Sequence, residues 1–121
     1  MILALAASLI FAHGDLPSPP MEVSQAVRNW RDCVSDGLRR RTDFSRSRGN
    51  PYELASTILA ECRPQQDAAF TARAQWVEGL ELSPEAQAVA LRRNERDVRA
   101  MHDRIIFRVR RATHESGQDW E

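Results

Sequence analysis

The sequence contains no lysine, and arginine carries all of its basic charge. The 17 basic residues are matched by 17 acidic ones, so the formal net charge is +0 at pH 7. This balance argues against a general binder of polyanions. No hydrophobic run is long enough to span a bilayer, which takes about 20 apolar residues. At 121 residues, the chain is expected to form one domain.

The motifs of the common enzyme classes are also missing. There is no glycine-rich phosphate loop, no Gly-x-Ser-x-Gly elbow and no carboxylate pair in a recognisable frame. Outside the N-terminal segment the only histidines are His102 and His114, which on one helix would lie about 18 Å apart and could not share a metal ion. His102 is not expected to face Asp103, because neighbours on a helix point apart. The sequence predicts a protein that is not an enzyme and has no cofactor.

Only two cysteines occur, Cys33 and Cys62. Their spacing differs from the Cys-x-x-Cys spacing of redox and zinc motifs and from haem attachment motifs. Acidic Asp32 and Asp36 stand near Cys33 and disfavour a nucleophilic thiolate. We therefore expect a structural disulfide, which indicates an oxidising compartment. The alternative is a pair of buried free thiols in a cytosolic protein.

The N-terminal residues 1–14 are predicted to be a signal peptide, because an apolar run of about a dozen residues ends in small residues. No basic residue precedes the run, so a buried N-terminal helix of a cytosolic protein is the alternative. Residues 15–21 are predicted to be a proline-rich linker, since proline lacks an amide donor and disfavours helix in the preceding residue. Together with the cysteine pair, the leader predicts a periplasmic or secreted protein with no transmembrane segment.

Apolar residues recur at steps of three and four along the rest of the chain. This pattern predicts an all-α fold, a small bundle of about four helices within residues 22–115, followed by a polar tail at 116–121. The first two helices would form a hairpin linked by the disulfide, and the last would be a long amphipathic helix. Capping signals at Asn50-Pro51 and Ser83-Pro84 set two of the starts. The expected helices cover residues 22–41, 50–64, 65–80 and 84–114, and Pro64 either ends the second helix or opens the third.

The apolar faces of these helices predict the core. Leu91 and Asn94 fall on the apolar stripe of the longest helix, where Asn94 would fix the register against a second copy. The predicted partners are therefore an unknown protein or a homodimer formed through this helix, with a plain intramolecular bundle as the alternative. The predicted core residues are Trp30, Leu38, Ile58, Trp76, Val98, Met101 and Ile105.

Arginine is concentrated in two segments. Residues 39–48 contain five arginines and one acid, and residues 92–111 contain eight arginines and three acids. Such mixed segments are usually solvated or complement one another. Nucleic acid is not the favoured partner, because acids are interspersed and the leader indicates export. If these segments bind an anion, the candidate residues are Arg39, Arg40, Arg41, Arg104, Arg108 and Arg111.

The segment Leu80-Glu81-Leu82-Ser83-Pro84-Glu85-Ala86-Gln87 resembles the LTxxQ motif of periplasmic stress chaperones and metal-resistance proteins. In that helical family the motif likewise opens a long amphipathic helix. Here Ser83 replaces the threonine, Gln87 stands one place later than the motif requires, and a second copy is absent. The resemblance implies a periplasmic protein that binds unfolded chains.

The function that the sequence favours is that of a small exported, non-enzymatic helical protein, acting as a structural or protein-binding module in the bacterial envelope. One alternative is a stress-chaperone-like binder of unfolded proteins. A second is a basic-helix binder of nucleic acid or of an anionic surface.

Overall fold

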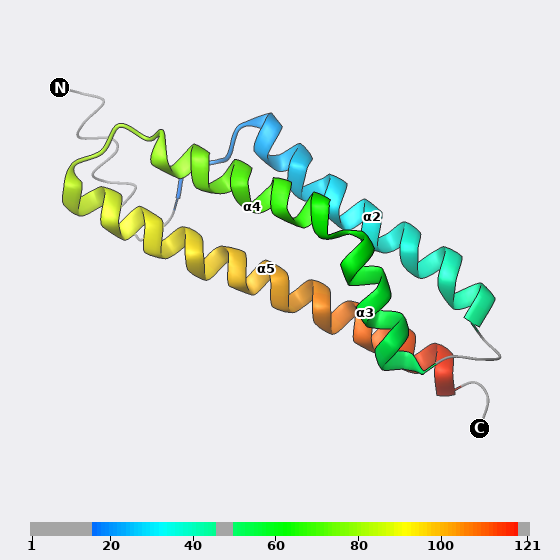
Figure 1. The fold of residues 1–121 in the computed structure, drawn as a ribbon. Coiled ribbons are helices and arrows are strands. Elements are labelled where there is room, and N and C mark those ends of the chain that lie inside the picture. The colour runs from blue at the N-terminus through cyan, green and yellow to red at the C-terminus, as the bar shows by residue number, and fades with distance from the viewer. Residues whose placement is uncertain (1–15, 46–49, 119–121) are drawn as a thin grey trace.

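The structure, a computed structural model, describes residues 16–45 and 50–118. These residues form four α-helices and no strand, so the predicted all-α bundle and its long C-terminal helix are confirmed. None of the four is both long and apolar enough to cross a lipid bilayer. The predicted signal peptide at residues 1–14 lies outside the described residues. The helices are α2 (Met21–Ser45), α3 (Pro51–Glu61), α4 (Arg63–Glu78) and α5 (Pro84–Gln118) (Figure 1).

Two of the helices begin at side chains that satisfy free backbone amides. At the start of α3, the side-chain oxygen of Asn50 accepts a hydrogen bond of 2.9 Å from the amide of Tyr52, and Pro51 occupies the first helical position. At the start of α5, the Ser83 hydroxyl accepts a hydrogen bond of 3.2 Å from the amide of Ala86. Both starts lie where the capping signals place them, because short polar side chains before a helix compete well for its free donors.

The three longer helices lie alongside one another. In Figure 1, α2 and α5 run in the same direction, α4 runs opposite to both, and α3 crosses the end of the molecule where α2 and α5 finish. The main packing partner of α2 is α4, while α3 packs mainly against α5. The first two helices are linked by the disulfide, as predicted, but α2 packs more extensively against α4 than against α3. The reason is that α3 has only 11 residues and divides its apolar side between α2 and α5.

The disulfide between Cys33 and Cys62 is present, with 5.8 Å between the two Cα atoms. Cys62 is the C-cap of α3 and also the N-cap of α4, and it is only 2% exposed. Pro64 falls in the first turn of α4, so it opens that helix. The bridge thus fastens the corner between α3 and α4 to the middle of α2.

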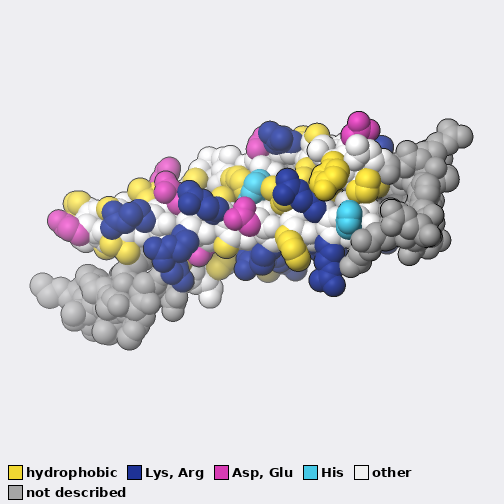
Figure 2. All heavy atoms as spheres, turned by 90° about the horizontal axis from the view of Figure 1, so that it is seen from below, with side chains coloured by type: hydrophobic (Ala, Val, Ile, Leu, Met, Phe, Trp, Pro, Cys, Tyr) yellow, Lys and Arg dark blue, Asp and Glu magenta, His cyan; other side chains and the backbone are white. Residues whose placement is uncertain are grey.

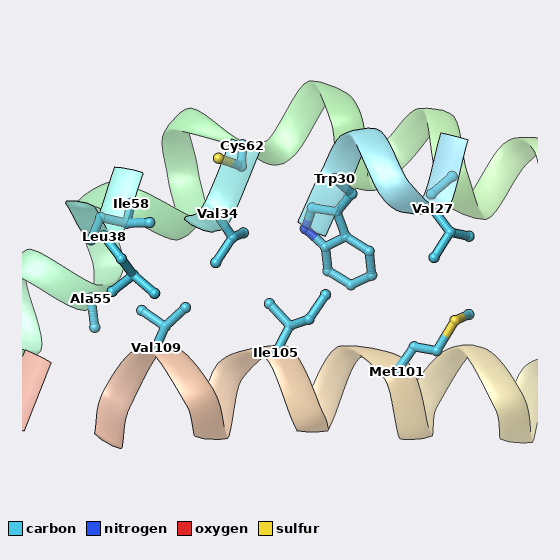
Figure 3. Close-up of a cluster of buried hydrophobic side chains, with 11 residues drawn as sticks. Val27, Trp30, Val34, Leu38, Ala55, Ile58, Cys62, Met101, Ile105 and Val109 are labelled. Atoms are coloured by element: carbon cyan, nitrogen blue, oxygen red, sulfur yellow. The ribbon is translucent and has the colours of Figure 1, made fainter. Parts of the chain in front are cut away.

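One hydrophobic core runs between the helices. Figure 3 shows the side chains of α2 pointing toward those of α5, with Val27 across from Met101 and Trp30 across from Ile105. Trp30 also meets the ring of Phe70 edge-on, with 5.3 Å between the ring centroids. The buried cluster consists of Val27, Trp30, Val34, Leu38, Ala55, Ile58, Cys62, Ala69, Met101, Ile105 and Val109.

Most of the predicted core is buried, but the stripe on α5 is offset from the expected one. Leu91 is 36% exposed and Ala90 takes the buried position, while Trp76 and Val98 are only half-buried. Counting back along the helix from Met101 in steps of four and three residues reaches Ala90, which therefore lies on the same stripe. Leu91 is the next residue and points about 100° away from Ala90. The predicted core residues that are buried are Trp30, Leu38, Ile58, Met101 and Ile105.

Two helices are longer than the sequence indicates. Helix α2 continues to Ser45, through residues that we expected to be a loop, and α5 continues to Gln118. Residues 42–45 are weak helix formers, but none is a glycine or proline that would stop a helix already stabilised by packing. The other residues between the helices expected at 22–41 and 50–64, residues 46–49, lie outside the described residues.

Helices α2 and α3 approach each other closely at Gly37. A Cβ atom built on Gly37 would lie 3.0 Å from Cγ2 of Ile58, whose side chain is fully buried. Such a distance is shorter than ordinary van der Waals contact between carbon atoms, which is about 3.5–4.0 Å. The absence of a side chain at Gly37 therefore allows α3 to lie against α2 one turn beyond Cys33.

Candidate functional site

Three of the predicted anion-binding arginines lie near the end of α2 and contact groups of the same chain. Arg39 forms an ion pair with Asp36, and Arg41 forms one with Glu61 at the end of α3. The Nε of Arg40 donates a hydrogen bond of 3.3 Å to the carbonyl oxygen of Asp36. Because these side chains remain substantially exposed, each pair adds only about 1 kcal/mol or less. Arg39 and Arg41 are thus paired with acids of the same chain, and Arg40 contacts a backbone carbonyl.

The other three predicted arginines, Arg104, Arg108 and Arg111, are exposed along α5. Arg108 donates a hydrogen bond of 3.3 Å to the hydroxyl of Ser35 on α2. Arg104 makes no ion pair with any residue in the ranges that the structure covers. Their steps of four and three place them on one side of the helix. That they bind an anion stays a prediction.

The fold brings residues 39–45 of the first arginine-rich segment and residues 104–111 of the second to the same end of the bundle, because α2 and α5 run in the same direction (Figure 1). Viewed from the side of α5, arginine side chains extend along the face, with acidic side chains interspersed among them (Figure 2). Residues 104–114 of α5 contain four arginines and no carboxylate. The finishing end of α5 is therefore more basic than its start.

A pocket of about 330 Å³ opens at this end, between the start of α3 and the last described turns of α5. Its surface is mainly apolar. Two of its aromatic residues are unusually exposed for their size, Tyr52 at 71% and Phe107 at 66%. We call this feature the aromatic–arginine pocket; it is lined by Pro51, Tyr52, Phe107, Arg110, Arg111, Thr113 and His114.

The local sequence explains how the pocket is assembled. On α5, Phe107, Arg110 and His114 are separated by three and four residues, so they share one side of the helix. Across from them, the Asn50 cap fixes the first turn of α3 and so sets the position of Tyr52. Arg110 forms no ion pair with any described residue. The pocket therefore combines exposed aromatic surface with arginine side chains.

A buried polar cluster joins α4 to α5 at a separate place. The Nε of Arg73 donates a hydrogen bond of 3.0 Å to the side-chain oxygen of Asn94, and its guanidinium lies 3.6 Å from the carboxylate of Asp97. Its charge also lies 5.4 Å from the ring centroid of Trp76. Burial lowers the pKa of Arg73, and the charge of Asp97 opposes this shift. The side chain of Asn94 thus bonds to a residue of the same chain. The cluster joins α4 to α5 through polar groups that have bonding partners.

No group of three or more His, Cys, Asp and Glu side chains is placed to hold a metal ion within the described ranges. The expectation that His102 and Asp103 do not face each other is wrong, because His102 Nδ1 lies 3.4 Å from an Asp103 carboxylate oxygen. At this length the contact is a weak one.

The segment that resembles the LTxxQ motif has a local structural role. The side-chain amide of Gln87 donates a hydrogen bond of 3.1 Å to the carbonyl oxygen of Val77 near the end of α4, and Ser83 caps α5. Both residues stabilise the turn between α4 and α5. This structural role accounts for the two residues without requiring that they bind an unfolded protein. Comparison of the chain with protein-family models, curated proteins and solved structures finds no match.

The site residues predicted from the sequence do not include Tyr52, Phe107 or Arg110. Phe107 carries a signal in retrospect, because it is a large aromatic residue among arginines on the polar side of an amphipathic helix. Tyr52 is an aromatic residue in the first turn of a capped helix. The pairing of the two could not be predicted, because it depends on α3 crossing the finishing end of α5.

Proposed function

We propose that the chain is a non-catalytic, protein-binding module of an oxidising compartment outside the cytosol, periplasmic or secreted, and that the aromatic–arginine pocket makes the contact. The observation that carries the proposal is the exposure of Tyr52 and Phe107, at 71% and 66%, beside a pocket edged by arginine. Aromatic residues and arginine are enriched at protein interfaces and in their energetic hot spots.

The compartment is supported by the Cys33–Cys62 disulfide. Disulfides persist in oxidising surroundings and are rare in the reducing cytosol. The leader predicted at residues 1–14 is consistent with the same location.

A capture experiment tests the binding role. The oxidised chain, freed of the leader, is immobilised beside its Phe107→Ala variant and a matched control, Val89→Ala. Val89 is also an exposed apolar residue on α5, 38% exposed, but lies at the opposite end of the helix. Proteins from the native source that are retained by the parent and by the control, and lost from Phe107→Ala, would support the proposal. If every retained protein binds all three equally, the proposal is wrong.

A binder of anionic polymers is the second candidate, because Arg104, Arg108 and Arg111 are exposed on one side of α5. Binding of that kind weakens steeply with salt, since counterions are released. Retention on duplex DNA that falls with salt and is lost on replacing Arg104 and Arg108 by glutamine, but not in Phe107→Ala, would favour it. Salt-independent or absent retention would remove it.

A further inference from the structure

We infer that the aromatic–arginine pocket takes an acidic peptide segment that carries one bulky apolar side chain, presented by a partner protein. This inference rests on the proposed protein-binding function and specifies the chemistry of the partner.

The size and lining of the pocket define the apolar part of the ligand. Its volume of about 330 Å³ lies at the low end of the roughly 300–1,000 Å³ found for ligand sites. Pro51 and Tyr52 form one wall and Phe107 lies on the other, so the walls offer ring faces to a hydrophobic group. A volume of this size is suited to one large side chain and is too small for an extended hydrophobic segment.

The charge around the pocket defines the rest of the ligand. Arg110, Arg111 and His114 line it from α5, and Arg108 lies one turn before Arg111. Residues 104–114 carry no carboxylate, and the acid of the first turn of α3 is Glu53. The first turn of α3, which contains Pro51 and Tyr52, adds the positive end of a helix dipole. Carboxylates beside an inserted apolar group would therefore be attracted to the α5 side of the pocket.

The neighbouring arginines favour a peptide over a nucleic acid. Arg39 and Arg41 of α2 are already paired with acids of this chain. A phosphate backbone is bound by a row of cations, each neutralising one phosphate. Arg110 and Arg111 instead lie beside one apolar pocket, and this arrangement matches a short acidic motif with an apolar anchor.

Fluorescence anisotropy with the oxidised chain tests the inference at physiological ionic strength. The probe is a fluorescein-labelled peptide of alternating Asp and Glu with one central Trp, compared with the same peptide carrying Ala in place of Trp and with a Lys-based version. We expect the acidic Trp peptide to bind best. Removing the Trp, or introducing Phe107→Ala or Arg110→Gln, should weaken binding by roughly ten-fold, as expected for loss of an interface anchor.

Val89→Ala is the matched control and should leave the affinity unchanged. Circular dichroism and thermal unfolding establish that each variant is folded; the replaced side chains are solvent-exposed, so we expect no loss of structure. The inference is overturned if the acidic Ala peptide or the Lys-based peptide binds as well as the Trp peptide, or if Phe107→Ala has no effect. A partner whose capture depends on Phe107, combined with no binding of the acidic Trp peptide, would overturn the ligand chemistry and leave the proposed function standing.

The chain contains a segment of the same composition, Asp119-Trp120-Glu121. A variant that ends at Gln118 lacks this segment, so it distinguishes binding of the chain's own segment in the pocket from binding of a partner's segment. Unchanged peptide affinity in this variant supports the partner. An affinity that rises by roughly ten-fold, equivalent to about 1.4 kcal/mol, would identify the chain's own segment as the resident occupant and overturn the proposal of an external partner.

Discussion

Opening the Cys33–Cys62 bridge should lower the free energy of unfolding by about 3–4 kcal/mol. The two residues are separated by 29 positions, and closing a loop of about that length in the unfolded chain gives about 3.6 kcal/mol in the chain-entropy description. Domains of this size are typically stable by about 5–15 kcal/mol, so the bridge supplies a large share. The midpoint of thermal unfolding should fall by roughly 15 °C for about 100 folded residues.

Urea titration followed by far-ultraviolet circular dichroism measures this change. The oxidised chain is compared with the reduced chain and with a Cys33→Ala/Cys62→Ala variant. Reduction retains both sulfur atoms, whereas the variant also removes packing at Cys62, which is 2% exposed. We therefore expect the variant to be less stable than the reduced chain, because deleting buried atoms leaves unfilled space.

The slope of the urea titration provides an internal control. A cross-linked unfolded chain is more compact, so opening the bridge should increase the slope. A reduced chain within about 1 kcal/mol of the oxidised one would refute the reasoning, because the loop-closure contribution would then be largely absent.

The close approach and the polar cluster give two further predictions, both measured by urea titration. Gly37→Ala should lower the free energy of unfolding by about 1–3 kcal/mol, because the added methyl group overpacks against Ile58. This loss should exceed the gain from the better helix propensity of alanine. The control Gly79→Ala, at the end of α4, should change the free energy of unfolding by less than about 1 kcal/mol. A stability for Gly37→Ala equal to or above that of the parent would contradict the close approach. Arg73→Ala and Asn94→Ala should each lose about 1–3 kcal/mol, and the double variant should lose less than their sum, because each single change leaves a buried partner unpaired. Strictly additive losses would show that the two side chains do not interact.

Local signals account for the parts of the fold that the sequence predicted. The Asn50-Pro51 start of α3 depends on one side chain meeting one nearby amide, so it can be identified from a few residues. The amphipathic periods of α2 and α5 extend over several turns and correctly gave most of the core. The cysteine pair was informative because its spacing left few alternatives to a disulfide.

The parts that were missed depend on contacts between distant segments. Arg73 lies at the middle of the buried row on α4, between Ala69 and Val77, but an arginine is ordinarily expected to reach solvent. It is buried because Asn94 and Asp97 of α5 meet it, and the pattern of α4 alone contains no sign of them. The same holds for the pocket, whose two walls come from α3 and α5.

The position of the bridge also affects what a protease can release. Every peptide bond from Val34 to Glu61 lies inside the ring that Cys33 and Cys62 close, and this ring includes the whole connection between α2 and α3. A single cut there would leave both fragments covalently attached, with α2 still fastened to the corner before α4. The chain would migrate as two pieces only after a reductant opened the ring, so a nicked molecule in an oxidising compartment would keep its parts together.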